Sequence, residues 1–279
     1  MQGTEVTPNT PAWIRIVDAQ DPRIRQFTGL TDVALRAVQE PAEGVFVAEG
    51  EKVVRRALEA GFAPLAVLAS DKWLRLLDAE GLLSAAVPRY AAPEDLLKAI
   101  TGYTVHRGVL VLMRRQPLPA LSVVLRHARR LVLLEGLKEH TNVGAIMRCA
   151  AAFGVDAVIT SPDCADPLYR RSVKVSMGTV FQVPWTTSTD WEATMNTVTD
   201  VGFTLAALTP DPDASDLRTW VESAPERVAL VLGTEGPGLI ESTLQRCSVR
   251  LRIPMSGGVD SLNVAAAAAV ALYALQPTP

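Results

Sequence analysis

Two turns rich in glycine stand out as places where the chain could hold a ligand. One contains Gly233, Gly236 and Gly238, and the other contains Gly257 and Gly258. Glycine permits tight turns and lets backbone N–H and C=O groups approach a ligand closely, which suits a molecule held mainly by main-chain hydrogen bonds. A single glycine in such a place usually only connects a strand to a helix. The five together predict a binding site.

Two polar side chains accompany a helix predicted over residues 143–153. Asn142 directly precedes it and would serve as its N-cap, because an asparagine side chain can accept a hydrogen bond from a first-turn N–H. Arg148 lies about 200° around the helix from Ile146, so it is off the apolar face. A guanidinium with a pKa above about 12 is a poor base and is better suited to holding a phosphate or stabilising charge. From the spacing alone, a solvated arginine is the simpler interpretation.

Three more polar side chains stand beside the glycine-rich turns. Glu235 comes two residues before Pro237, a favoured first-turn residue, so its carboxylate could simply complement a helix N-terminus. Ser261 and Asn263 begin the last predicted helix. Their i, i+2 spacing directs them to different sides, so one is expected to cap the helix while the other points into a site.

An alternating series of strands and helices, beginning at Leu131, would position these side chains. The strands are predicted over 131–134, 155–160, 203–208, 228–232 and 249–253, and the helices over 143–153, 167–175, 191–201, 237–246 and 262–275. Apolar strands that alternate with helices predict an α/β fold with a parallel sheet covered on both faces. Ligands of such sheets bind beyond the carboxyl ends of the strands, where the glycine-rich turns lie. The pattern by itself favours a Rossmann-type sheet and indicates no knot.

A smaller α/β domain is predicted ahead of this series. We expect it to span residues 1–115, followed by a linker over 116–125, which begins with Gln116-Pro117-Leu118-Pro119, and a second domain over 126–279. Within the first domain, strands are predicted over 45–48, 64–69 and 105–113, and helices over 51–60 and 71–79.

Composition and cysteine spacing limit the class of protein. The chain has 279 residues, 48% of them apolar, which is enough for a core in each of two domains. Its three cysteines lack the paired spacing of a zinc site or disulfide framework, so we expect no metal and a reducing, cytoplasmic location. No signal peptide is expected, and the longest apolar run, 264–275, is too short to span a membrane.

Charge is distributed unevenly, although the net formal charge is only −3. Residues 98–130 contain seven basic residues and no acidic one, whereas residues 182–226 contain eight acidic residues and one base, Arg218. We interpret the first window as facing phosphates and the second as facing away from polyanions. The alternative interpretation is that both windows are ordinary solvated surface.

Three segments resemble the signature motifs of the SpoU branch of the SPOUT RNA methyltransferases. They are residues 142–148 (NVGAIMR) with Phe153-Gly154, residues 232–239 (LGTEGPGL) and residues 253–265 (IPMSGGVDSLNVA). More loosely, residues 46–50 and 106–110 resemble the substrate-binding extension of many SpoU enzymes, a small α/β module related to ribosomal RNA-binding proteins. Residues 1–27 lie outside this resemblance.

The resemblance implies a fold, an activity and a set of site residues. The fold would be a C-terminal trefoil-knot domain, and the activity would be methyl transfer from S-adenosylmethionine to a ribose 2′-hydroxyl of structured rRNA or tRNA. The implied cofactor contacts are Leu232, Gly233, Gly238, Ile253, Met255 and Leu262. The implied catalytic residues are Arg148, Asn142, Glu235, Ser261 and Asn263, with Glu235 orienting Arg148. Whether Arg148 is the base or a phosphate clamp stays open, and a homodimer with a shared site is implied as well.

Basic residues close to these segments are expected to bind RNA. They are Lys52, Arg55, Arg107, Arg114 and Arg115 in the first domain and Arg170, Arg171 and Lys174 in the second. Two other functions differ in kind. A non-enzymatic RNA-binding protein could keep the fold, although the intact polar set argues against it. A Rossmann-type oxidoreductase would need Gly-x-Gly-x-x-Gly after the first strand, where the chain has Gly136-Leu137-Lys138 instead.

Overall fold

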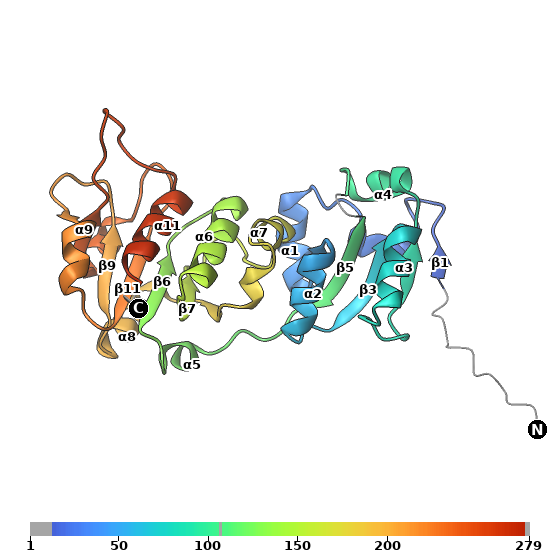
Figure 1. The fold of residues 1–279 in the computed structure, drawn as a ribbon, viewed down its shortest axis with the longest axis horizontal. Helices are drawn as coiled ribbons and strands as arrows, with labels where there is room; N and C mark the ends of the chain where they lie inside the picture. Colours follow the sequence, from blue (N-terminus) through green and yellow to red (C-terminus); the bar gives the residue numbers. More distant parts are fainter. Residues whose placement is uncertain (1–12, 106–107, 277–279) are drawn as a thin grey trace, which may run out of the picture. The chain divides into compact units, whose positions relative to one another are not determined.

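A computed structural model describes residues 13–105 and 108–276, and the chain divides into two compact units, residues 1–116 and 117–279 (Figure 1). The predicted RNA contact Arg107 lies outside the described residues. The division falls beside the proline-containing segment that begins at Gln116.

The first unit is built on a five-stranded mixed sheet with the order β1-β4-β3-β5-β2. Its strands are β1 (Trp13–Arg15), β2 (Val45–Glu49), β3 (Pro64–Ala69), β4 (Arg89–Ala91) and β5 (Val109–Arg114). Its helices are α1 (Val33–Ala42), α2 (Glu51–Glu59), α3 (Asp71–Ala79) and α4 (Glu94–Thr101), with a 3-10 helix at Pro22–Phe27. β5 runs antiparallel to β2 and β3, while β1, β4 and β3 are parallel. Every residue of β2 is buried, as expected for a strand covered on both faces.

The structure refines the sequence expectations for the first unit at two places. Residues 13–27, which lie outside the family resemblance, are part of its fold, because β1 pairs with β4 and the side chains of Ile24 and Phe27 are fully buried in its core. The strand predicted over 105–113 begins only at Val109.

The second unit contains a seven-stranded sheet with the order β10-β12-β9-β11-β6-β7-β8. Its strands are β6 (Arg130–Leu134), β7 (Ala157–Thr160), β8 (Trp185–Thr187), β9 (Thr204–Leu208), β10 (Ser215–Asp216), β11 (Val228–Leu232) and β12 (Val249–Arg252). All of its strand pairs are parallel, which confirms the predicted parallel sheet. The turns that follow β6, β9, β11 and β12 therefore lie at one edge, called here the carboxyl edge.

Helices cover both faces of this sheet. They are α5 (Leu121–Leu125), α6 (His140–Ala152), α7 (Arg170–Val175), α8 (Trp191–Asp200), α9 (Leu217–Trp220), α10 (Glu241–Arg246) and α11 (Val264–Ala274). α5, α8 and α10 contribute to a core under alternate residues of the strands, such as Leu131 and Leu133. α6 and α11 pack together over the opposite face (Figure 1). Since α5 buries Val124 and Leu125 in this core, the prediction that the linker extends to residue 125 is wrong.

Two of the helix starts that differ from the prediction affect the site. α6 starts at His140 with Glu139 as its N-cap, so Asn142 is a buried residue of the first turn and not the cap. α10 starts at Glu241, because the left-handed backbone of Gly236 and Gly238 (φ 90° and 72°) cannot be part of a right-handed helix. Glu235 consequently belongs to a turn and does not face a helix N-terminus.

Candidate active site

The turn after β11 is shaped by a close approach of the chain to itself. A Cβ atom on Gly233 would lie 2.5 Å from the Leu239 nitrogen and 2.5 Å from the Gly238 carbonyl carbon, so only glycine fits. The backbone N–H and the hydroxyl of Thr234 both donate to the Gly238 carbonyl oxygen, at 3.3 and 3.2 Å. The segment 233–239 therefore closes into a compact turn at the carboxyl edge.

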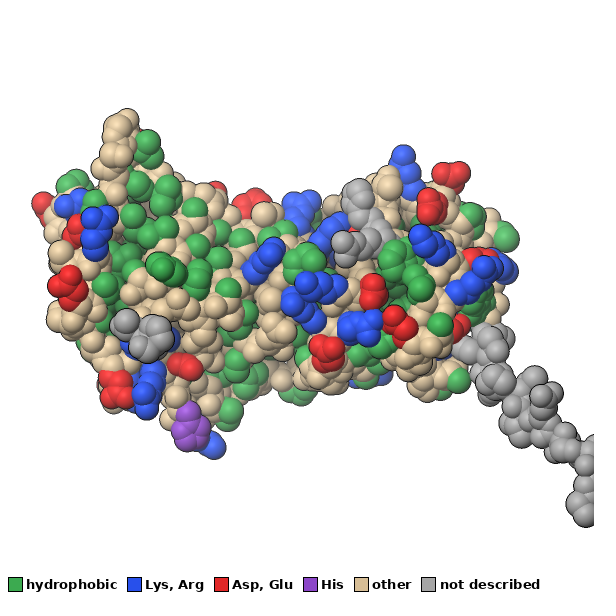
Figure 2. Space-filling view, in the orientation of Figure 1, with side chains coloured by type: hydrophobic (Ala, Val, Ile, Leu, Met, Phe, Trp, Pro, Cys, Tyr) green, Lys and Arg blue, Asp and Glu red, His purple; other side chains and the backbone are tan. Residues whose placement is uncertain are grey.

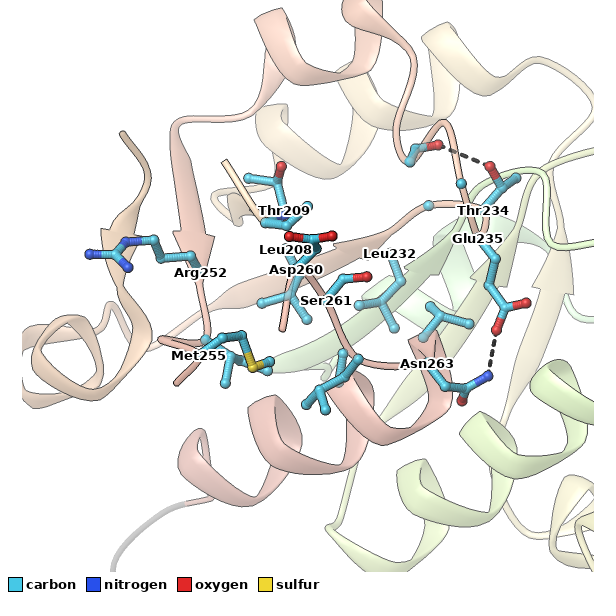
Figure 3. Close-up of a pocket in the computed structure, with 18 of the residues that line it drawn as sticks. Leu208, Thr209, Leu232, Thr234, Glu235, Arg252, Met255, Asp260, Ser261 and Asn263 are labelled. Carbon is cyan, nitrogen blue, oxygen red and sulfur yellow. Dashed lines mark hydrogen bonds between the residues drawn. The ribbon is translucent and has the colours of Figure 1, made fainter. Parts of the chain in front are cut away.

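The amide of Asn263 joins all three motif segments. Its Oδ1 accepts hydrogen bonds from the backbone N–H groups of Ala265 (3.0 Å) and Ala266 (3.4 Å), so Asn263 is the N-cap of α11. Because the oxygen is used in this way, the NH2 group faces the site, where it donates to Asn142 Oδ1 at 3.1 Å. It also donates to Glu235 Oε1 (Figure 3). The sequence argument divided the capping and site roles between two residues, but Asn263 performs both.

A cavity of about 570 Å³ lies beside this junction (Figure 3). Its volume is within the range of about 300–1,000 Å³ that is usual for small-molecule sites. All six residues expected to contact the cofactor line it: Leu232, Gly233, Gly238, Ile253, Met255 and Leu262. Glu235, Ser261 and Asn263 line it too. The predicted cofactor residues thus surround one cavity, next to four of the five predicted catalytic residues.

Several lining residues were not predicted. Leu208, Thr209, Pro210 and Pro212 come from the end of β9 and the turn after it, and Arg252 and Asp260 are also part of the wall. The end of the strand predicted over 203–208 was a usable signal, because the carboxyl ends of neighbouring parallel strands share an edge.

Arg148 is the member of the expected catalytic set that the structure leaves apart. Its side chain is exposed, it does not line the cavity, and within the described residues no hydrogen bond or ion pair holds it. On α6 it is about 9 Å along the axis and about 120° around from Asn142. The expectation that Glu235 orients Arg148 is therefore not met in a single chain, where Glu235 is held by Asn263 instead.

Helices α6 and α7 approach each other closely at Gly144. A Cβ atom there would lie 2.5 Å from the Ser172 carbonyl oxygen. This contact places the basic residues of α7: Arg171 is exposed and Lys174 is half-buried, whereas Arg170 is only 8% exposed. Burial of Arg170 contradicts its expected role as a surface contact for phosphate.

Comparisons with known proteins agree with the geometry of the carboxyl edge. A model of the SpoU rRNA methylase family matches residues 129–273. The chain belongs to this family. A relative named as an uncharacterized tRNA/rRNA methyltransferase of Mycobacterium bovis is 42% identical over 259 residues, which cover 92% of this chain and 90% of the relative. The 23S rRNA (guanosine-2′-O-)-methyltransferase of Nitrosomonas europaea is 35% identical over 185 residues, covering 64% of this chain and 70% of that enzyme.

Solved structures share the fold of nearly the whole chain. A crystal structure of an AdoMet-bound rRNA methyltransferase from Sinorhizobium meliloti has a TM-score of 0.80 at 23% identity and covers 94% of this chain and 97% of that one. The structure of an RNA 2′-O ribose methyltransferase has a TM-score of 0.72 at 26% identity and covers 94% and 98% of the two chains.

The basic residues of the first unit that were predicted to bind RNA differ in exposure and in their contacts with other protein groups. Figure 2 shows basic side chains gathered over this unit with acidic ones between them. Lys52 and Arg114 are exposed. Arg55 is paired with Glu51 and Glu80 at 2.8 and 2.7 Å, and Arg115 Nε donates to the Val45 carbonyl oxygen at 2.8 Å. These carboxylates and this carbonyl oxygen of the protein would therefore compete with RNA for Arg55 and Arg115.

Two arginines of the basic window 98–130 contact groups of the second unit itself. Arg129 and Arg130 lie at the amino end of β6, on the edge of the sheet opposite to the cavity. Arg129 is paired with Glu226 at 3.3 Å, and Arg130 donates to the carbonyl oxygens of Leu275 and Glu226. RNA binding by the window 98–130 stays a prediction, and at these two positions RNA would compete with acceptors of the protein itself.

Among the residues that the structure describes, no helix is long and apolar enough to cross a membrane, and no three His, Cys, Asp or Glu side chains are arranged to hold a metal ion.

Proposed function

We propose that this SpoU protein transfers the methyl group of S-adenosylmethionine to a ribose 2′-hydroxyl of structured rRNA or tRNA. The observation that carries the proposal is the Asn263 amide, which holds Asn142 and Glu235 together at the mouth of the cavity. The names of the relatives, tRNA/rRNA methyltransferase and 23S rRNA (guanosine-2′-O-)-methyltransferase, agree with this activity.

The cavity fits the cofactor in charge and in surface. S-adenosylmethionine carries a sulfonium, an ammonium and a carboxylate, and the lining includes the acids Glu235 and Asp260 and the base Arg252. Leu232, Ile253, Met255 and Leu262 supply apolar walls. When bound, the cofactor supplies an electrophilic methyl group. The missing side chain of Gly233 lets the backbone of Gly238 and Leu239 approach the end of β11, which shapes this wall of the cavity.

The polar residues at the mouth of the cavity would handle the acceptor. Asn142 and Glu235 are fixed by Asn263, and Ser261 adds a hydroxyl to the lining. They can orient the ribose hydroxyl through hydrogen bonds and restrain its position. A guanidinium is a poor proton acceptor, so we assign Arg148 to clamping a phosphate and stabilising charge as the hydroxyl proton leaves.

We also propose a homodimer formed around α11, with a shared active site. Val270 and Tyr273 of α11 are 43% and 69% exposed, and Figure 2 shows hydrophobic side chains gathered over α6 and α11. α6 carries Arg148 and packs on α11, so pairing across this face would bring Arg148 to the interface. Light scattering should give about twice the 30.0 kDa of one chain. A particle of one chain's mass at micromolar concentration would contradict the dimer.

The knot and the location complete the proposal. The trefoil knot of the SPOUT fold is assigned to the segment that follows β12 and returns through residues 253–263 to α11. A protein with free Cys149, Cys164 and Cys247 and an RNA substrate is assigned to the cytoplasm. The first unit is assigned to RNA binding through its exposed bases, Lys52 and Arg114.

Binding and methylation tests separate this function from its alternatives. Calorimetry with S-adenosylmethionine and S-adenosylhomocysteine should give saturable binding, and mapping of ribose methylation in total RNA with and without the gene should reveal the modified nucleotide. Binding of RNA without any transfer would favour the non-enzymatic protein. Absence of cofactor binding by folded protein, with a signal for NAD, would favour an oxidoreductase.

A further inference from the structure

A buried carboxylate, Glu135, lies just outside the cavity and has no part in the mechanism described above. It follows β6 directly and is 6% exposed. Three donors converge on it: the Ile240 N–H at 2.8 Å, the Trp191 indole N–H at 2.7 Å and the Thr243 hydroxyl. Since all three groups donate, the site is built for the ionised carboxylate.

The three donors come from separate parts of the second unit. Trp191 begins α8, Thr243 lies in α10, and Ile240 is the last residue before α10. Burying a charge among neutral groups costs free energy that an apolar side chain would avoid. What the carboxylate provides in return is a strong, directional acceptor for the Ile240 N–H, because hydrogen bonds to ionised groups are stronger than neutral ones.

Ile240 is the far end of the turn that forms one wall of the cavity. The turn leaves β11 at Gly233, carries Glu235, and ends at the Ile240 N–H that Glu135 accepts. Between these ends Glu235, Gly236 and Pro237 are exposed and have little packing to hold them. The next residue after Glu135 also meets the turn, since a Cβ on Gly136 would lie 2.9 Å from Thr234 Cγ2.

We propose that Glu135 is a positioning residue for the cofactor cavity, which fixes the 233–240 turn through the Ile240 N–H. With the anchor in place, the turn is held in its binding conformation before the ligand arrives. Without it, the turn samples other conformations, and part of the binding free energy is used to order it. This inference rests on the proposed function only in that the cavity takes S-adenosylmethionine.

The sharpest variant removes the hydrogen bond from the side of the turn and leaves Glu135 and its two side-chain donors, Trp191 and Thr243, unchanged. Ile240 has φ −69°, which already matches proline, and its side chain is 58% exposed. Ile240→Pro therefore deletes the N–H donor at little other cost, and Ile240→Ala keeps the donor as the matched control. Glu135→Gln is a second variant, in which the Ile240 N–H either donates to a neutral amide oxygen in place of a carboxylate or, with the amide turned the other way, faces an NH2 group that cannot accept.

Calorimetry with S-adenosylhomocysteine and hydrogen exchange of residues 233–240 provide the test on the full-length protein. We expect Ile240→Pro and Glu135→Gln to weaken binding roughly 10-fold or more, since a hydrogen bond to a charged group is lost. Exchange of the remaining amides of the turn should accelerate, while Ile240→Ala resembles the wild type. Wild-type affinity in folded Ile240→Pro would overturn the anchoring role, even if Glu135→Gln fails to fold. Absence of binding by the wild type would instead overturn the proposed function.

Discussion

The two edges of the seven-stranded sheet use polar side chains in different ways. At the amino edge, Arg227 donates to the carbonyl oxygens of Leu125, Ala128 and Val201 and lies 4.2 Å from the ring centre of Phe203. At the carboxyl edge, Asn263 connects side chains from three turns around a cavity. Polar groups at the amino edge form hydrogen bonds with the protein's own backbone, while those at the carboxyl edge are arranged around the cavity. A basic residue in the sequence does not by itself tell which of these tasks it performs.

The largest effect that would sharpen this contrast is expected for Arg148→Ala. Loss of one positioned electrostatic group typically lowers a rate by about 10² to 10³. Affinity for S-adenosylmethionine should stay nearly unchanged, because Arg148 does not line the cavity. Single-turnover methyl transfer and calorimetry would measure the two quantities. Arg129→Ala, on the amino edge, is the matched control and should keep the wild-type rate. A rate near wild type for Arg148→Ala would assign the step to another residue.

Two glycine substitutions would separate packing from binding. In both Gly233→Ala and Gly144→Ala the new Cβ meets backbone at 2.5 Å, so both should lower the melting temperature. Only Gly233 lines the cavity, and only its variant should weaken binding of S-adenosylhomocysteine, by roughly 10-fold or more for a distortion of about 1–3 kcal/mol. Equal loss of affinity in both variants would mean that the binding site depends on the whole second unit and not on this turn.

At the amino edge we expect a substitution to lower the stability of the protein and to leave the rate of methyl transfer unchanged. Arg227→Met removes three hydrogen bonds to carbonyl oxygens while keeping much of the apolar stem. Urea unfolding should show a loss of about 1–3 kcal/mol, and methyl transfer by the folded variant should match the wild type. A slower reaction in fully folded Arg227→Met would break the division of roles between the edges.

The smallest effect concerns pH. Burial lowers the pKa of His140, the first residue of α6, whose ring lies 4.1 Å from that of Tyr169. The unfolded chain then binds a proton more readily than the folded chain, so stability should fall as the pH drops below about 6.5. Urea unfolding at pH 7.5 and 5.5 should show a larger loss for the wild type than for His140→Gln. The same loss in both proteins would assign the pH dependence to other groups.

The sequence predicted the cavity better than it predicted the helix boundaries around it. Leu232, Ile253 and Met255 could be predicted because they lie at or just after predicted strand ends and within short motif sequences. Both signals depend only on residues close together in the chain. The start of α6 was misplaced because Asn142 is a preferred N-cap residue, whereas the actual N-cap, Glu139, is not and makes no side-chain cap hydrogen bond. The start of α10 depends on backbone angles of Gly236 and Gly238 that no residue type dictates.

The roles of residues that depend on partners far away in the sequence could not be predicted from the sequence. Glu135 takes its donors from positions 56 to 108 residues further along the chain, and no spacing rule connects them. Burial of Arg170 depends on how α7 packs against α6. The number of charges in the window 98–130 did not indicate that Arg129 and Arg130 lie at the amino edge of the sheet, away from the cavity.

The double use of Asn263 restricts what can replace it. Aspartate would keep the cap of α11 but could not donate to Asn142 and Glu235, and serine would cap but has a single hydrogen to give. Glutamine would carry the same amide on a longer stem that no longer reaches the Ala265 and Ala266 N–H groups in the N-cap geometry. Only asparagine meets both demands. A substitution that relaxed one demand would fail on the other, so the helix and the catalytic junction must change together or not at all.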